Sequence, residues 1–124
     1  MRLLLDTHVF LWFVADDEKL RAPVRGAIRD ADVVYVSAAS AWEIIIKVGL
    51  GKLRFPDAVE DAVRSSGFSP LPILLSHADA VALLPSFHAD PFDRLLVAQA
   101  RVEGLRFVTH DRKIKRYPVD VFPA

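Results

Sequence analysis

Short runs of apolar and β-branched residues alternate along this chain with longer stretches of helical periodicity. The runs that predict strands are RLLLD at 2–6, VVYVS at 33–37, FSPLPI at 68–73, RFVT at 106–109 and VDVF at 119–122. Strands separated by helices form parallel βαβ units with right-handed crossovers. The alternation therefore predicts the α/β class, with a parallel central sheet that carries helices on both faces.

The stretches between these runs contain residues that typically start and stop helices. Ser40 is expected to cap AWEIIIKVGLG, with Glu43 completing a capping box, and Asp90 is expected to cap PFDRLLVAQARVEG. Pro56 is expected at the first position of a helix that ends before Gly67. Further helical segments are expected over 16–31, after Ser76, and as a short turn over 111–117.

The bulk composition limits the class of protein. No linker, internal repeat or low-complexity tract divides the 124 residues, so we expect a single domain over residues 1–124. No run approaches the roughly 20 apolar residues of a membrane span, and we predict neither a membrane segment nor a signal peptide. The absence of cysteine excludes disulfides and thiolate metal sites, and it fits the expected cytoplasmic location.

The charge is balanced overall but uneven along the chain. Sixteen basic and sixteen acidic residues cancel, which argues against a nucleic-acid footprint over the whole surface. Basic residues gather near the C-terminal end, in the cluster Arg112, Lys113, Lys115 and Arg116. This cluster has two interpretations: a solvated charged face, or a contact with the phosphate backbone of RNA.

Four acidic residues stand at positions that the topology brings together. Asp6 ends the first strand, and Glu43 lies one turn into the helix after the second strand. Asp93 lies at the start of the helix that leads into RFVT, and Asp111 directly follows that strand. Ligands of open parallel sheets bind beyond the carboxyl ends of the strands. We therefore expect the four acids to converge on one edge of the sheet.

Each acid also has a purely structural explanation. Asp6 and Asp111 can cap the helical segments that follow them. Glu43 can complete a capping box or pair with Lys47, and an acid at Asp93 suits the N-terminal end of a helix. These explanations account for each residue singly but not for the convergence of all four.

Carboxylates gathered within a few ångströms repel one another unless a cation lies among them. An oxygen-rich set of ligands without cysteine favours a hard ion, Mg²⁺ or Mn²⁺. Such an ion activates water and stabilises charge that develops on a phosphoryl group. The expected chemistry is phosphodiester hydrolysis.

Four motifs, in order and spacing, carry a family resemblance that covers essentially the whole chain. LLLDTHVFLW, SAASAWEIIIKVGLGKL, DPFDRLLVAQA and VTHDRKI resemble the motifs of PIN-domain ribonucleases, specifically the VapC-type toxins of bacterial toxin–antitoxin pairs. The resemblance implies a three-layer α/β/α sandwich on a parallel sheet of four or five strands. It also implies Mg²⁺- or Mn²⁺-dependent cleavage of RNA.

Carried over by position, the resemblance implies a set of catalytic, metal-binding acids, namely Asp6, Glu43, Asp93 and Asp111. Thr7 and Thr109 match small polar positions whose hydroxyl bonds a carboxylate or a ligand water. Asp90 belongs to the same motif as Asp93 but has the character of a helix cap. His8 and His110 flank motif acids, yet the family pattern requires imidazole at neither place.

The resemblance implies partners as well. It predicts an RNA substrate, a homodimer, and a cognate antitoxin whose C-terminal segment lies over the active site. The apolar stretches Val9–Val14 and Ile44–Leu53 are candidates for a groove that receives an amphipathic helix, with core burial as the alternative for most of these residues.

Other α/β proteins with acidic sites fit the sequence less well. A phosphoacceptor receiver domain needs an adjacent acid pair after the first strand and a Lys after the last, and a haloacid-dehalogenase-type phosphatase needs Asp-x-Asp where this chain has Asp6-Thr7-His8. The remaining alternative is a non-catalytic interaction or regulatory module.

Overall fold

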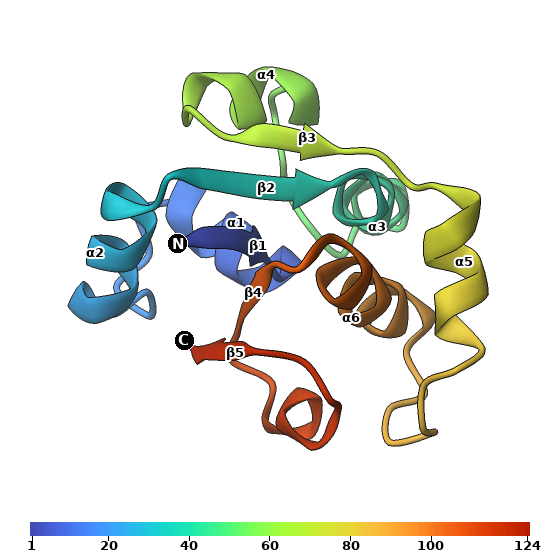
Figure 1. The fold of residues 1–124 in the computed structure, drawn as a ribbon. Coiled ribbons are helices and arrows are strands. Elements are labelled where there is room, and N and C mark those ends of the chain that lie inside the picture. The colour runs from blue at the N-terminus through green and yellow to red at the C-terminus, as the bar shows by residue number, and fades with distance from the viewer.

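In the computed structural model, which describes residues 1–124, five strands form one parallel sheet in the order β3-β2-β1-β4-β5 (Figure 1). The strands are β1 (Arg2–Leu5), β2 (Val33–Ser37), β3 (Ser69–Leu71), β4 (Arg106–Thr109) and β5 (Val121–Pro123). The predicted α/β class and parallel central sheet are confirmed. From β1 the chain builds the sheet outward in both directions, through β2 and β3 on one side and through β4 and β5 on the other. The topological switch point, where open α/β sheets bind ligands, therefore lies at the carboxyl ends of β1 and β4.

The helices form layers on the two faces of this sheet. They are α1 (Thr7–Val14), α2 (Ala22–Asp30), α3 (Ala38–Gly49), α4 (Val59–Ser65), α5 (Leu75–Val81), α6 (Pro91–Glu103) and the 3₁₀ helix η1 (Arg112–Arg116). No helix is long and apolar enough to cross a membrane.

The core is divided by the sheet into two apolar clusters. Leu3 and Leu5 pack with residues of α1, α2 and α4, whereas Leu4 packs on the other face with residues of α6 and η1. This division follows from the two-residue period of a strand, which sends successive side chains to opposite faces. A continuous apolar run such as LLL is therefore what a strand covered on both faces requires.

A buried polar contact fixes α6 against the sheet. The Ser37 hydroxyl at the end of β2 donates to Gln99 Oε1 at 2.5 Å, and the Gln99 amide nitrogen donates to the Pro72 carbonyl at 3.2 Å. Gln99 is fully buried in the middle of α6. Because unpaired polar groups in a core are costly, these bonds favour one placement of α6 and of the acid in its first turn.

Several predicted helix starts are wrong. Ser37, not Ser40, caps α3, because the chain enters the helix directly from β2 and the Ser37 hydroxyl accepts from the Ala39 amide at 3.0 Å. Glu43 consequently belongs to no capping box. α4 begins at Val59 rather than at Pro56, because its buried apolar residues first recur at helical spacing from Val59 onward.

Two other helices also begin at residues that differ from the predicted ones, for local reasons. α2 starts at Ala22 because residues 16–21 form a turn in which Asp16 has a φ of 50°. α5 is preceded by Leu74, whose amide donates to His77 Nδ1 at 3.0 Å, so Ser76 is not its cap. The prediction for α6 is confirmed: Asp90 Oδ1 accepts from the Phe92 amide at 2.8 Å, and Gly104 ends the helix with a φ of 65°.

Candidate active site

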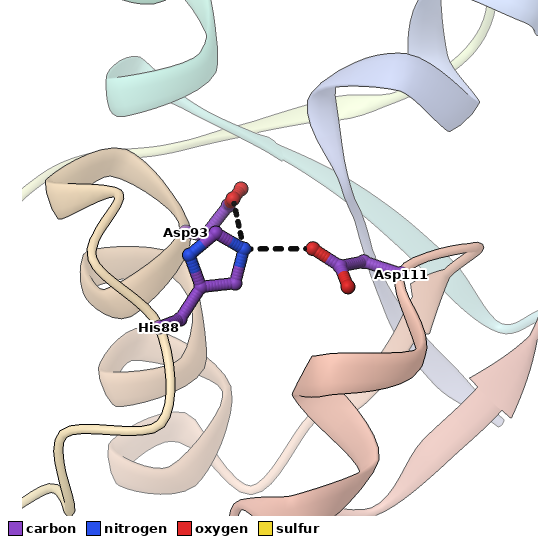
Figure 2. Close-up of side chains that lie close together, drawn as sticks. All are labelled: His88, Asp93 and Asp111. Atoms are coloured by element: carbon purple, nitrogen blue, oxygen red, sulfur yellow. Dashed lines mark hydrogen bonds and ion pairs between the residues drawn. The ribbon is translucent and has the colours of Figure 1, made fainter.

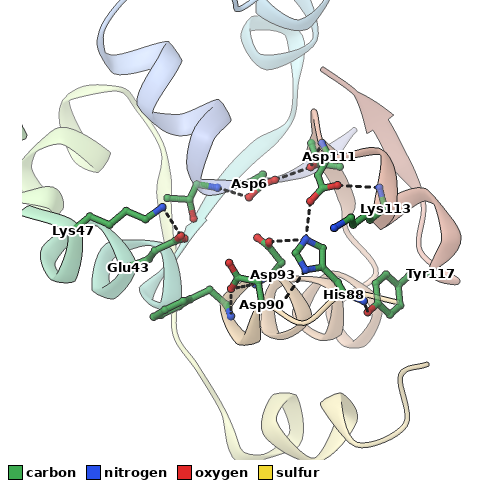
Figure 3. A network of polar contacts seen from close by, with 12 residues as sticks. Asp6, Glu43, Lys47, His88, Asp90, Asp93, Asp111, Lys113 and Tyr117 are labelled. Carbon is green, nitrogen blue, oxygen red and sulfur yellow. Dashed lines mark hydrogen bonds and ion pairs between the residues drawn. The ribbon is translucent and has the colours of Figure 1, made fainter. Parts of the chain in front are cut away.

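The four predicted acids come from four separate elements and face a common space at the carboxyl edge of the sheet (Figure 3). Asp6 follows β1, Glu43 projects from α3, Asp93 lies in the first turn of α6, and Asp111 follows β4. The expected convergence on one edge is therefore observed.

Asp6 is held rigidly in the floor of this site. Its side chain is almost fully buried, Oδ1 accepts from the Thr7 amide at 2.7 Å, and Oδ2 accepts from the Thr109 hydroxyl at 2.6 Å. The Thr109 Oγ1 also accepts from the Asp111 amide at 3.1 Å. Thr109 thus connects two of the acids.

Thr7 contributes from the other side. Its hydroxyl donates to Ser40 Oγ at 2.9 Å, and both residues are buried. The contact ties the start of α1 to α3, the helix that carries Glu43. Both threonines predicted as supporting polar residues therefore lie among the acids, where Thr109 bonds a carboxylate directly and Thr7 does so through its backbone.

Glu43 is buried with its two oxygens in different environments. Oε2 pairs with Lys47 Nζ at 2.9 Å, one helical turn away, while Oε1 is buried without any hydrogen-bond partner. An unpaired buried carboxylate oxygen is unfavourable. A cation that binds among the acids would relieve this cost.

The tightest grouping is Asp93, Asp111 and His88 (Figure 2). His88 Nε2 lies 2.7 Å from Asp111 Oδ2 and 3.1 Å from Asp93 Oδ2. His88 Nδ1 accepts from the Asp90 amide at 3.1 Å, so the proton of the neutral ring is on Nε2, between the two carboxylates. The His88 amide donates to the Tyr117 hydroxyl, which fixes the loop before α6.

His88 is a residue that the sequence analysis missed. It lies in a loop two positions before the Asp90 cap, and a single histidine there has no periodicity or partner that marks it. The only available signal was its closeness in sequence to Asp93. The two histidines that were considered do not join the carboxylates: His8 is exposed, and His110 Nδ1 donates to the Ala124 carbonyl at 2.7 Å.

Burial and crowding shift the pKa values of the acids. Burial, followed by repulsion from Asp6 and Asp90, raises the pKa of Asp93 to about 7, against the opposing attraction of His88. Burial also raises the pKa of Asp6, although bonds from Thr109 and Thr7 oppose this. Only these bonds and the charge of His8 favour its ionised form.

Asp111 behaves differently because it is more exposed and better supplied with donors. Burial alone would raise its pKa, but the Lys113 amide and His88 outweigh that effect and hold the pKa of the Asp111 carboxyl below its usual range. The site thus combines one readily ionised acid with two whose charge is unfavourable in the absence of a cation.

The set of donors fits a hard divalent cation. Carboxylate oxygens of Asp93 and Asp111 lie within 4.8 Å of each other and of a ring nitrogen of His88, so the two carboxylates are close enough to share one ion. Carboxylate oxygens are the preferred ligands of such ions, and a divalent charge would offset the repulsion that raises the pKa of Asp93.

The predicted basic cluster flanks this site on η1. Arg112, Lys113, Lys115 and Arg116 are all exposed. The Arg116 guanidinium lies 4.3 Å above the Phe87 ring, and the backbone amide of Lys113 donates to Asp111. In Figure 3 the acids lie between Lys47 on one side and Lys113 on the other.

Comparison with known proteins places this geometry in a known family. The model of the PIN domain matches residues 3–120. Ribonuclease VapC22 of Mycobacterium tuberculosis (strain ATCC 25618 / H37Rv) is 34% identical over 122 residues, which cover 93% of this chain and 91% of that protein.

Solved structures share the fold at low identity. VapBC2 from Rickettsia felis, bound to a fragment of promoter DNA, aligns with a TM-score of 0.75 at 14% identity over 99% of this chain and 98% of that one. DNA-bound VapBC from Salmonella typhimurium gives 0.74 at 19% over the same shares, and a toxin–antitoxin complex from Klebsiella pneumoniae gives 0.69 at 16% over 98% of both chains. The expected PIN-like α/β/α architecture is therefore confirmed.

The raised pKa of Asp93 predicts how stability depends on pH without metal. Between the ordinary value of 3.8 and the folded value of about 7, the folded state holds a proton that the unfolded chain has lost. The free energy of unfolding should therefore fall as the pH rises from about 4 to about 7. Asp93→Asn should remove its own part of this fall, leaving that of Asp6, and should be more stable than wild type near pH 8. Urea unfolding in chelator measures both.

The matched control is Asp79→Asn, which removes an exposed acid of α5 outside the site. It should leave the pH dependence unchanged. Parallel curves for wild type and Asp93→Asn would contradict the prediction.

The position of His88 predicts a linked effect on metal binding. His88→Leu removes the N–H between Asp93 and Asp111, so the variant should melt below wild type in chelator. If the ring occupies the place that a cation would take, added Mn²⁺ should raise the melting temperature more in the variant than in wild type. A smaller rise in the variant would instead make His88 a ligand, and equal rises would remove it from the site.

Proposed function

The chain belongs to the PIN-domain family, and on that premise we propose that it is a metal-dependent endoribonuclease that acts as the toxin of a toxin–antitoxin pair. The observation that carries the proposal is the convergence of four carboxylates from four elements, with burial and mutual repulsion that a divalent cation would relieve. The relative named Ribonuclease VapC22 supports the reaction class.

The proposed ligands of the cation are Asp6, Glu43, Asp93 and Asp111, and the proposed ion is Mg²⁺ or Mn²⁺, which oxygen ligands favour. When bound, such an ion supplies activation of a water and stabilisation of charge on the scissile phosphate. Thr109 and the Thr7 amide orient the Asp6 carboxylate by direct hydrogen bonds. Lys47 fixes one oxygen of Glu43 and leaves the other directed into the site.

The proposed partners follow from the same family. The structural neighbours include a toxin–antitoxin complex and VapBC assemblies, which supports a cognate antitoxin for this chain. We propose that the C-terminal segment of this antitoxin lies over the active site. We also propose an RNA substrate and a homodimer. Exposed apolar residues of α3, such as Ile45 and Val48, are available for an interface between proteins.

The central test is cleavage of total RNA with and without Mg²⁺ or Mn²⁺. Asp6→Asn, Glu43→Gln, Asp93→Asn and Asp111→Asn each remove a charge while keeping shape, and each should lower cleavage by on the order of 100-fold or more. Asp90→Asn is the matched control, because Asn caps a helix nearly as well as Asp and this variant should keep its activity.

Growth arrest on expression should be lost in the four charge-removing variants and kept in Asp90→Asn. Metal-independent cleavage, or full activity of all four charge-removing variants, would contradict the metal site. The absence of any RNA cleavage with metal would favour the non-catalytic interaction module.

We propose further that the basic cluster on η1 contacts the RNA backbone. Lys113→Ala with Lys115→Ala should weaken RNA binding and reduce the salt dependence of the binding constant by roughly 0.7 per lost phosphate contact, since each contact releases counterions. The control is Lys19→Ala with Arg29→Ala, two exposed cations on other elements. An unchanged salt dependence of the binding constant in the η1 variant would show that the cluster is a solvated charged face.

A further inference from the structure

A groove of about 710 Å³ opens beside the carboxylates, between α1 and the segment that follows α3. It reaches the site at two points: Lys47, which lines the groove, pairs with Glu43, and His8, also in the lining, is two residues from Asp6. Its volume lies in the range of sites that take one small organic group. A ligand in the groove would therefore lie next to a group bound at the acids.

The wall of the groove on the site side is aromatic. The half-buried Trp12 indole lies between two imidazoles, with ring centroids 6.5 Å from His8 and 5.5 Å from His110. His8 follows β1 and His110 follows β4, so neighbouring strands bring these rings together at the same edge as the acids. Phe55 lines the groove as well. Trp12 and Phe55 thus give the lining of the groove two aromatic side chains.

Cations on the other wall have no protein partner. Lys52 and Arg54 line the groove and are exposed, and neither forms an ion pair with any carboxylate of the chain. Two acids, Asp17 and Asp57, line the groove as well, but neither pairs with Lys52 or Arg54, so both cations are available to a phosphate. A nucleotide has the matching combination of an aromatic base and a phosphate.

We infer that the groove binds an unpaired base of the RNA next to the scissile phosphate, with the base stacked on Trp12 and its phosphate beside Lys52 and Arg54. This inference rests on the proposed ribonuclease function. It restricts the substrate to single-stranded RNA, because bases inside a duplex already stack on one another and do not present a free face. It also makes Trp12 a residue that binds substrate without taking part in the chemistry.

The test is steady-state cleavage of a random-sequence pool of single-stranded oligoribonucleotides with Mn²⁺. Trp12→Leu keeps apolar bulk without a ring and should raise KM roughly 5- to 150-fold with kcat nearly unchanged. Trp12→Phe keeps a ring and should raise KM less. Trp42→Leu is the matched control: Trp42 is exposed on α3 outside the groove lining, and its variant should keep the wild-type KM.

A second measurement avoids any folding defect of Trp12→Leu. Because the chain has two tryptophans, Trp42→Phe leaves Trp12 as the sole source of indole emission. In chelator, single-stranded RNA should quench this emission, whereas duplex RNA and inorganic polyphosphate should not. Binding of labelled RNA without quenching would overturn the inference.

The outcomes separate the two proposals. If wild type cleaves RNA and both Trp12→Leu and Trp12→Phe have the wild-type KM, the stacking site is overturned. The ribonuclease proposal then remains intact. An unchanged KM together with loss of a copurifying protein in Trp12→Leu would assign the groove to a protein segment and likewise overturn the inference. Absence of cleavage by wild type overturns the proposed function, and the emission titration still decides whether Trp12 binds RNA.

Discussion

The repulsion among carboxylates gathered at one sheet edge is the constraint on which the rest of this structure depends. A parallel sheet brings Asp6 and Asp111 together because β1 and β4 are neighbours, the first turn of α6 adds Asp93, and the second turn of α3 adds Glu43. The fold opposes their separation with buried contacts, such as the bond from the Thr109 hydroxyl to Asp6. Burial of Asp93, followed by repulsion from Asp6 and Asp90, raises the pKa of its carboxyl, which is the electrostatic cost of this arrangement.

His88 is the part of the chain that reduces this repulsion in the absence of metal. Its Nε2–H donates to Asp111 Oδ2 and lies close to Asp93 Oδ2, and the loop that carries the ring is fixed through the Tyr117 hydroxyl and the Asp90 amide. The protein therefore has an internal donor at the place where its most crowded acids meet. The ring therefore occupies the space next to the two carboxylates that we propose as ligands of a cation.

Most of the fold and the positions of the four acids could be predicted from the sequence, because both depend on local patterns. The three-leucine run specifies a strand buried on both faces, and acids at strand ends and helix starts must meet in a parallel sheet. Helix starts such as Ser37 and Val59 could not be predicted, since they depend on where the chain leaves the sheet and first reaches the core. His88 was missed because its role arises only from tertiary contacts with Asp93 and Asp111.

The capping explanation, which the sequence presents as an alternative to a metal site, is observed for two of the acids without removing them from the common site. Asp6 caps α1 through the Thr7 amide and Asp111 caps η1 through the Lys113 amide, while both face the common site. A helix start directs backbone N–H groups at the carboxylate and thereby favours its ionised form. At Asp111 such a bond helps to hold the pKa of the carboxyl below its usual range, whereas at Asp6 it only opposes the larger effect of burial, which raises the pKa. Caps at this edge are therefore a means of building the site, and an Asn at either position keeps the helix while removing the charge.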